Sequence, residues 1–291
     1  MPGSPILVTG ASGNVGRAVV TELLASGARV RAAVGGGNEP SDWFTDAEGR
    51  LETVRLDFTQ PGTWDVYRGV ERVFLMRPPH LGRPRRQMLP SLAAMRAAGV
   101  RHVTFLSLQG AERNRVVPHA TVEEWLRDSG LGWTFVRAAF FMQNLTTTHS
   151  SDIRDRDEIV VPAGRGATAF VDAADVGAVA AAALLDPPAH TERVWTPTGP
   201  RAVTYDEVAR ILSRVLDRPI RYRAPGAVTY ALHARRHLGM PAAMVAVTTA
   251  IYTAARLGRA AGLTDDVHTV LGRDPVSFEE FAVTHADSWG R

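Results

Sequence analysis

The chain has 291 residues, of which 45% are hydrophobic and 22% charged, and its formal net charge is +3. The composition is ordinary for a globular protein with a substantial core, and the length suffices for one large α/β domain or for a domain with a sizeable second lobe. The absence of cysteine excludes disulfides, thiolate nucleophiles and cysteine-bound metals. All 33 basic residues are arginine, which also excludes Schiff-base lysines, the P-loop lysine and a Tyr-Lys catalytic pair.

Hydropathy and charge indicate neither a membrane nor a nucleic-acid partner. The longest alanine-rich run, GAVAAAALL, is too short to span a bilayer. The start, MPGSPILVTG, lacks the basic and apolar regions of a signal peptide. The basic clusters RPRR (83–86) and HARRH (233–237) carry no aromatic interleaving and are interpreted as solvated surface. We therefore expect a cytoplasmic location and a small-molecule substrate.

Strand-like and helix-like patterns alternate through the first half of the chain. Strands are predicted at 5–9, 29–34, 51–56, 71–76, 102–106 and 132–137. Helices are predicted between them at 14–26, 62–69, 85–98 and 117–129. This alternation predicts an α/β fold, a doubly wound parallel sheet with helices on both faces.

The pattern loosens after residue 150. A loop is predicted over 155–170, an alanine-rich helix over 172–185, a strand over 193–198, a helix over 204–216 and a short strand over 218–223. Two helices separated by Gly239–Pro241 follow over 225–259, and a last helix begins near Ser277. We predict a dinucleotide-binding core over 1–150 and a smaller, mostly helical substrate lobe over 151–291, from which segments can return to the core.

Three glycines stand between the first predicted strand and the first predicted helix, in ILVTGASGNVGRAVV (6–20). A G-x-x-G-x-x-G turn in this context allows a tight turn, close approach of a pyrophosphate and close helix–strand packing. Amides at the helix N-terminus then face the phosphates. The alternative is a turn that serves packing alone. The expected dinucleotide site comprises Gly10, Ser12, Gly13, Asn14, Val15 and Gly16.

The end of the second predicted strand normally distinguishes NAD from NADP. The segment RVRAAVGGGNEP has no acidic residue there to bind an adenosine ribose, and Gly35 offers no charge to a 2′-phosphate. Arg31, within the strand, is a candidate phosphate ligand or an ordinary surface residue. We expect NADP or NAD as the cofactor, with a slight lean to NADP.

Two later residues belong to the same predicted sheet edge. Asp57, after the third strand, is a candidate to accept a hydrogen bond from the adenine amino group, or it caps the helix that follows. Arg77 follows the fourth strand in MRPP (76–79). We expect it to line the cofactor cleft, because open α/β sheets bind ligands at the carboxyl ends of their strands.

Several stretches together resemble the NmrA-like family of atypical short-chain dehydrogenases/reductases. That family includes quinone reductases, isoflavone reductase-like enzymes and redox-sensing regulators. The matching stretches are VTGASGNVG (8–16), LDFTQP (56–61), VFLMRPP (73–79), FLSLQGAERN (105–114), PHATVEEWLRDSGLGWTFVRAAFFMQNL (118–145) and FVDAADVGAVAAAAL (170–184). The resemblance implies a Rossmann fold that binds NAD(P) and a small substrate lobe.

The chain also departs from the family pattern. Common short-chain dehydrogenases use a tyrosine four residues before a lysine, and this chain has no lysine and no tyrosine between residues 68 and 204. Isoflavone reductase-like members place a lysine where His119 aligns. Members that prefer NADP often carry an arginine where this chain has Gly35. These departures argue against ordinary NADPH reduction.

Candidate catalytic residues follow the fifth predicted strand. Ser107 is a candidate to hydrogen-bond a substrate carbonyl, and Gln109 to contact the substrate. His119 is the nearby group whose ordinary pKa suits proton transfer near neutral pH. The alternative for His119 is a surface residue that merely begins a helix.

A cluster of apolar and amide side chains follows the sixth predicted strand in FFMQN (140–144). Phe140, Phe141 and Asn144 are candidates for an apolar wall with an amide that orients the substrate. The equally weighted alternative is that the run is simply core.

His233 and His237 are four residues apart on a predicted helix, a spacing that a metal could use. No carboxylate follows them, and the flanking Arg235 and Arg236 would repel a cation. We therefore expect no metal site.

Three functions remain open from the sequence. The first is an NAD(P)-dependent oxidoreductase that transfers hydride to a small aromatic or quinone-like carbonyl substrate. The second is an NAD(P)-binding redox sensor without turnover, which contacts a protein partner; the missing tyrosine and lysine favour it. The third is a non-redox cyclase or isomerase on the same fold.

Overall fold

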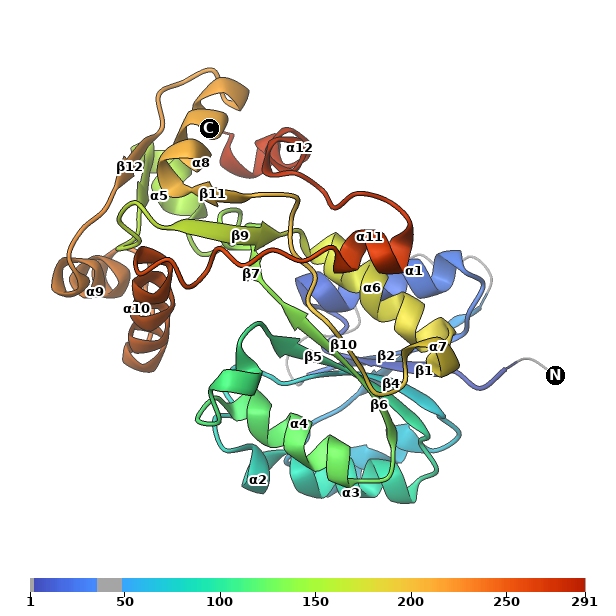
Figure 1. Ribbon diagram of the computed structural model, residues 1–291. Coiled ribbons are helices and arrows are strands. Elements are labelled where there is room, and N and C mark those ends of the chain that lie inside the picture. The colour runs from blue at the N-terminus through green and yellow to red at the C-terminus, as the bar shows by residue number, and fades with distance from the viewer. Residues whose placement is uncertain (1–2, 36–48, 291) are drawn as a thin grey trace. The chain divides into compact units, whose positions relative to one another are not determined.

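The computed structural model describes residues 3–35 and 49–290, which form two compact units (Figure 1). The first unit comprises residues 1–138, 173–197 and 269–272, and the second comprises 139–172, 198–268 and 273–291. The segment 173–197 thus belongs to the first unit although residues of the second unit flank it. The division into a dinucleotide-binding core over 1–150 and a substrate lobe over 151–291 stays a prediction.

A seven-stranded sheet forms the centre of the first unit. Its order is β10-β6-β5-β4-β1-β2-β3, and every neighbouring pair is parallel. The strands are β1 (Ile6–Thr9), β2 (Val30–Val34), β3 (Leu51–Arg55), β4 (Arg72–Met76), β5 (His102–Leu108), β6 (Gly132–Ala138) and β10 (Arg193–Trp195). This arrangement confirms the predicted doubly wound α/β fold. Its switch point lies between β1 and β4, where such folds bind their ligands.

Helices cover both faces of this sheet (Figure 1). On one face lie α1 (Asn14–Ala25) and α6 (Ala173–Leu185), and on the other α3 (Leu89–Ala97) and α4 (Pro118–Asp128). The shorter elements of this unit are η1 (Pro61–Tyr67), α2 (Pro84–Gln87), η2 (Ala111–Arg113) and α7 (Pro187–His190). Apolar side chains of the sheet and of the α3–α4 face form one buried cluster, which includes Leu7, Leu92 and Phe135.

Two small sheets organise the second unit. In one, β9 (Ala167–Val171) pairs antiparallel with β11 (Ala202–Thr204) and parallel with β7 (Phe140–Phe141). In the other, β8 (Glu158–Val160) pairs parallel with β12 (Arg221–Arg223). The predicted loop over 155–170 is therefore wrong in part. Strands of three to five residues paired with distant segments leave too short a local pattern for recognition.

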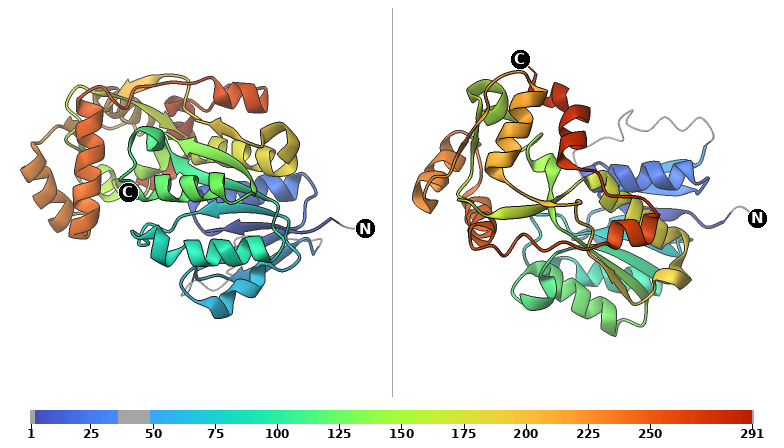
Figure 2. Two further views of the ribbon diagram at one scale, coloured as in Figure 1. Left: turned by 60° about the horizontal axis from the view of Figure 1, so that its bottom comes forward. Right: turned by 45° about the horizontal axis from the view of Figure 1, so that its top comes forward.

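Helices complete the second unit. They are η3 (Met142–Asn144), α5 (Ser150–Arg156), α8 (Tyr205–Val215), α9 (Ala227–Arg236), α10 (Ala242–Arg256), α12 (Phe278–Thr284) and η4 (Ala286–Trp289), while α11 (Asp266–Leu271) crosses the boundary between the units. A capping box begins α8, in which the Thr204 hydroxyl accepts from the Glu207 amide and the Glu207 carboxylate accepts from the Thr204 amide. Helices α8 and α12 lie side by side (Figure 2, right).

Within residues 3–35 and 49–290, no helix has both the length and the apolar character that crossing a bilayer requires.

Candidate functional site

The glycine turn joins β1 to α1, and two of its three glycines are required by the protein itself. Gly10 has φ +62°, and a Cβ added there would lie 2.3 Å from Met76 Cε. A Cβ on Gly16 would lie 2.1 Å from the Gly10 carbonyl oxygen. At Gly13 the nearest atom to an added Cβ is that same oxygen, at 3.4 Å, an ordinary contact. No close contact within the described residues requires the absence of a side chain at Gly13, and this arrangement is compatible with the close approach of a pyrophosphate.

The other predicted residues of the turn contribute mainly backbone. The Ser12 carbonyl oxygen accepts a hydrogen bond of 3.0 Å from Arg17 Nε. Asn14 is exposed and begins α1, whereas the Val15 side chain is buried in the core. Because α1 begins at Asn14, its first amides lie next to Gly13, in the position that favours an anion.

Arg77 follows β4 and is held by its own loop. Its Nη1 donates to the carbonyl oxygens of Pro78, Pro79 and Leu81 at 2.8, 3.2 and 3.0 Å. Its Nε is buried and has no hydrogen-bond partner among the described residues. Since a buried donor without a partner is costly, this orphaned Nε fits a site that a polar ligand completes.

His119 lies in the first turn of α4. Burial and, to a smaller extent, the positive charge of Arg77 lower the pKa of His119 to about 4, although the carboxylate of Glu123 opposes the shift. The imidazole is therefore neutral at neutral pH, which differs from the expectation of a group that titrates there. Its buried Nδ1 has no hydrogen-bond partner within the described part of the chain. A neutral imidazole can still donate one hydrogen bond and accept another.

Ser107, the second-last residue of β5, is bound to a carboxylate that the sequence analysis did not single out. Its hydroxyl donates to Glu123 Oε1 at 2.7 Å, and Arg137 donates to both oxygens of Glu123 at 3.0 and 2.7 Å. Because the single hydroxyl proton is used, Ser107 offers only lone pairs to a ligand. The expectation that Ser107 donates to a substrate carbonyl does not agree with this geometry.

Glu123 is ionised although it is almost fully buried. Burial raises the pKa of Glu123, but the hydrogen bonds from Arg137 and Ser107 and the charges of Arg137 and Arg127 outweigh it, so that the pKa is lowered. Arg137 also pairs with Glu112 at 2.9 Å. The available sequence signal was a glutamate one helical turn after His119, at a position that faces the core.

Asp57 caps a turn and not the following helix η1, whose N-cap is Gln60, and the adenine contact stays a prediction. Its Oδ1 accepts from the amide and the hydroxyl of Thr59 at 2.8 and 2.7 Å, as a turn cap does. These hydrogen bonds lower the pKa of Asp57. Among the described residues no hydrogen bond to Oδ2 is formed, so this oxygen is available to an adenine amino group.

Arg31 does not lie where a 2′-phosphate ligand is needed. It is the second residue of β2, near the end of the strand opposite to the carboxyl edge. Its guanidinium binds Glu52 Oε2 at 2.9 Å and the carbonyl oxygens of Val66 and Arg68 at 2.8 and 2.9 Å. The strand tip that normally selects the cofactor continues from Gly35 into residues 36 and 37, which lie outside the described residues.

The predicted substrate residues fall in different units. Gln109 is half-buried in the first unit, and its backbone N–H donates to the Ala138 carbonyl oxygen at 3.0 Å. Phe140, Phe141 and Asn144 are half-buried in the second unit, in β7 and η3. The Phe140 ring packs against that of Tyr252 on α10, with 5.7 Å between centroids, so this residue is partly core and partly surface.

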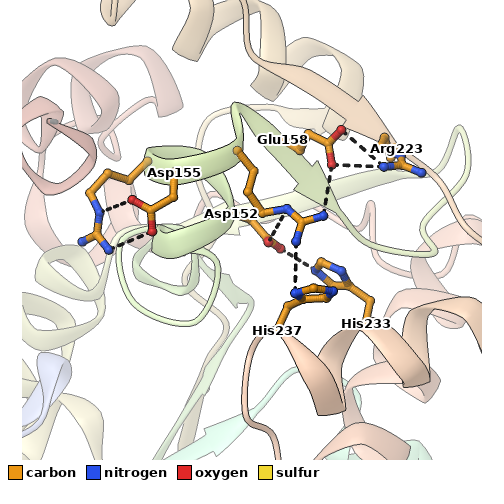
Figure 3. Close-up of polar contacts among 8 residues, drawn as sticks. Asp152, Asp155, Glu158, Arg223, His233 and His237 are labelled. Carbon is orange, nitrogen blue, oxygen red and sulfur yellow. Dashed lines mark hydrogen bonds and ion pairs between the residues drawn. The ribbon is translucent and has the colours of Figure 1, made fainter.

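The pair His233 and His237 has polar partners that the sequence did not reveal (Figure 3). His233 Nε2 lies 2.7 Å from Asp152 Oδ2, and Arg156 Nη1 lies 3.1 Å from His237 Nδ1. The nearby Glu158 pairs with Arg223 (Figure 3). A carboxylate is thus present, but an arginine shares it, and the described residues contain no group of three or more ligating side chains that could hold a metal ion.

Comparison with known proteins identifies the family. The model of the NmrA-like family matches residues 2–274. The chain belongs to the NmrA-like family. The resemblance predicted from the sequence motifs is thereby confirmed.

Individual known proteins match over nearly the whole chain. The NAD(P)H azoreductase of Xenophilus azovorans is 34% identical, with 98% of this chain and 99% of the relative covered. The triphenylmethane reductase of Citrobacter sp., complexed with NADP(H), has a TM-score of 0.82 at 25% identity, covering 97% and 99% of the two chains. An NADPH-dependent quinone oxidoreductase of Escherichia coli, complexed with NADPH, has a TM-score of 0.84 at 22% identity over 97% and 99%. Structural neighbours thus hold the cofactors that the glycine turn predicted.

Proposed function

We propose that this NmrA-like protein is an NAD(P)H-dependent reductase that passes hydride to a small aromatic acceptor, such as a quinone or an aromatic dye. The observation that carries the proposal is the carboxyl edge of the first unit. There, no close contact within the described residues requires a glycine at position 13, and Arg77 Nε and His119 Nδ1 are buried without partners among the described residues. The 34% identity to an azoreductase over the whole chain supports the same chemistry.

Each residue has a stated task in this proposal. The glycine turn and the first amides of α1 hold the pyrophosphate, and Asp57 Oδ2 accepts from the adenine amino group. Ser107, whose proton is committed to Glu123, accepts from an N–H or O–H group of the cofactor or the substrate. Arg77 Nε and a neutral His119 donate to oxygen atoms. Bound NAD(P)H supplies the hydride.

The acids of the chain restrict the kind of acceptor. Burial raises the pKa of Tyr67 and Tyr222 to about 12, and it also raises the pKa values of Tyr205, Tyr230 and Tyr252, which completes the five tyrosines. With His119 neutral as well, neither His119 nor a tyrosine supplies a strong acid to the hydride step. Two kinds of acceptor can take up hydride without a proton from a strong acid. A quinone becomes a stable phenolate, and a delocalised cation becomes neutral. Water then supplies any remaining proton.

The turnover experiment follows NADPH absorbance with a water-soluble quinone and a cationic triarylmethane dye. We expect oxidation of NADPH whose kcat/KM shows no break near pH 6.5, because the pKa of His119 is lowered to about 4. His119→Gln, which keeps an amide donor, should retain more activity than His119→Ala, which should lose roughly 10- to 100-fold. A His-dependent break between pH 6 and 7 would contradict the proposed neutral donor.

Gly13→Ala tests cofactor binding separately from turnover. Gly13 has φ −82° and ψ 167°, values that alanine adopts freely, so the variant should keep its thermal midpoint. The added methyl group should raise the Kd for NADPH roughly 10- to 100-fold, equivalent to about 1–3 kcal/mol. Titration followed by nicotinamide fluorescence measures the Kd for NADPH of the wild type and of the variant, and thermal denaturation measures the midpoint. Gly62→Ala is the control, since a Cβ there meets nothing within 4 Å; equal affinities in the two variants would refute the pyrophosphate assignment.

The second candidate function is a dinucleotide-binding regulator. The observation that favours it is that the pKa of His119 is lowered to about 4 and that of Tyr67 is raised to about 12, so that neither residue is suited to donate a proton near neutral pH. Tight NADPH binding without oxidation by any acceptor of a broad panel would select it. Turnover of a substrate without consumption of NADPH would instead select the non-redox enzyme.

A further inference from the structure

The place where a 2′-phosphate would bind can be found from the strand register. Val34, the last residue of β2, pairs with Arg55, the last residue of β3, in the parallel ladder. Neighbouring strands lie about 4.8 Å apart, so Arg55 stands directly beside the strand end that contacts the adenosine ribose in doubly wound folds. The first unit therefore has a cation at the expected position, contributed by the next strand.

The alternation of the strands also places Arg55 on the appropriate face of the sheet. Ala33 and Val54 belong to the apolar cluster on the α3–α4 face. Side chains alternate along a strand, so Val34 and Arg55 project to the opposite face, which α1 covers. This is the face from which the amides at the α1 N-terminus approach a pyrophosphate. Arg31 projects to the other face, because the carbonyl oxygens of η1 and its flank bind it.

Arg55 is available for a ligand. Its side chain is exposed, and within the described residues it makes no hydrogen bond or ion pair that would hold it elsewhere. Its positive charge reaches Asp57, where it adds to the lowering of the carboxyl pKa that the Thr59 hydrogen bonds begin. Arg55 and Asp57, the proposed adenine contact, are thus near enough for their charges to interact.

We propose that Arg55 binds the 2′-phosphate of NADP(H) and makes the protein prefer NADPH over NADH. A planar guanidinium donates two parallel hydrogen bonds to a phosphate, and NADH has only a hydroxyl at that position. The proposal rests on the proposed reductase function, since it assumes that the glycine turn binds a dinucleotide. It replaces the assignment of the phosphate to Arg31.

The experiment compares Arg55→Ala with the wild-type chain by nicotinamide fluorescence titration with NADPH and with NADH. We expect the Kd for NADPH to rise roughly 10- to 100-fold, while the Kd for NADH stays the same. Adenosine 2′,5′-bisphosphate should displace NADPH from the wild type far better than ADP does, and this difference should disappear in the variant. Arg29→Ala is the matched control, an exposed arginine just before the opposite end of β2.

The outcomes separate this inference from the proposed function. If the wild type binds both cofactors and Arg55→Ala leaves their affinity ratio unchanged, the assignment of Arg55 is wrong and the reductase proposal stands. Equal weakening of NADPH and NADH, or an equal loss in Arg29→Ala, also overturns it, because either result indicates a general effect of charge. If the wild type binds neither cofactor, the proposed function fails first.

Discussion

Glu123→Ala is expected to lower the free energy of unfolding by about 3–5 kcal/mol, the cost of leaving one buried charge without its partner. The carboxylate is only 2% exposed and receives hydrogen bonds from Ser107 and, at two positions, from Arg137. Removing it leaves the Ser107 hydroxyl without its acceptor and the Arg137 guanidinium with only the partly exposed Glu112 as an ion-pair partner. Chemical denaturation measures the change, and the same titration gives the slope that checks two-state unfolding.

Glu124→Ala provides the control, because the neighbouring carboxylate is exposed and pairs with Arg85 at the surface. Its loss should change the free energy of unfolding by about 1 kcal/mol or less. Replacing Glu123 and Arg137 together by leucine and methionine should recover most of the loss, since a buried ion pair is often replaceable by apolar residues. Equal losses for Glu123→Ala and Glu124→Ala would refute the energetic role of the buried pair.

The contribution of Glu123 also has a predicted pH dependence. Since the folded-state pKa of Glu123 is lowered below its ordinary value of 4.5, its contribution is present above pH 4.5 and is lost as the pH falls through the lowered value. His119 acts in the same direction. Its pKa falls from 6.5 to about 4 on folding, so its contribution to the free energy of unfolding decreases as the pH falls from 6.5 to about 4.

The strands of the first unit could be predicted because each one is a short apolar run between turn signals, followed by a helix on schedule. Parallel strands that helices cover on both faces need such runs, and the observed β1 to β6 begin and end within two residues of the predicted bounds. In the second unit, β8 and β12 have three residues each and pair across a long stretch of chain. The local sequence pattern does not predict the pairing of such short, distant strands.

The candidate site could be predicted by position but not by partner. The glycine turn and Arg77 directly follow strands, Ser107 lies at the carboxyl end of β5, and His119 begins the helix after β5; strand ends and helix starts can be read from the sequence. Their chemistry depends on neighbours that only folding provides. The Glu123 carboxylate uses the proton of Ser107, and burial keeps His119 neutral. Spacing along the chain contains neither fact.

Arg31 and Arg55 illustrate the same limit. Both are arginines on predicted strands near the expected phosphate position, and both stand in the first unit. Only the register shows that Arg55 lies beside the end of β2, whereas Arg31 lies near its beginning. In the proposed assignment, selection between NADPH and NADH depends on which end and which face of the sheet carries the arginine. This is a property of the sheet and not of any single segment.

Gly177→Ala is expected to lower the free energy of unfolding by about 2–3 kcal/mol, in the upper part of the range for overpacking. Gly177 lies in α6, which belongs to the returning segment 173–197 and packs against α1. A Cβ there would lie 2.4 Å from Ala18 Cβ and 3.1 Å from backbone atoms of Ala18 and Val19. The two helices would have to separate, although alanine itself is the better helix former.

Ala18→Gly tests whether this one contact causes the loss. Alone it should cost about 1 kcal/mol through helix propensity, but combined with Gly177→Ala it removes the closest clash. The double variant should therefore be more stable than the sum of the single effects predicts, by about 1–2 kcal/mol. Thermal and chemical denaturation of the four proteins complete the cycle, with Gly62→Ala as the neutral control. Strict additivity would mean that the helix pair relaxes elsewhere, and that the glycine is not what lets the returning segment dock against α1.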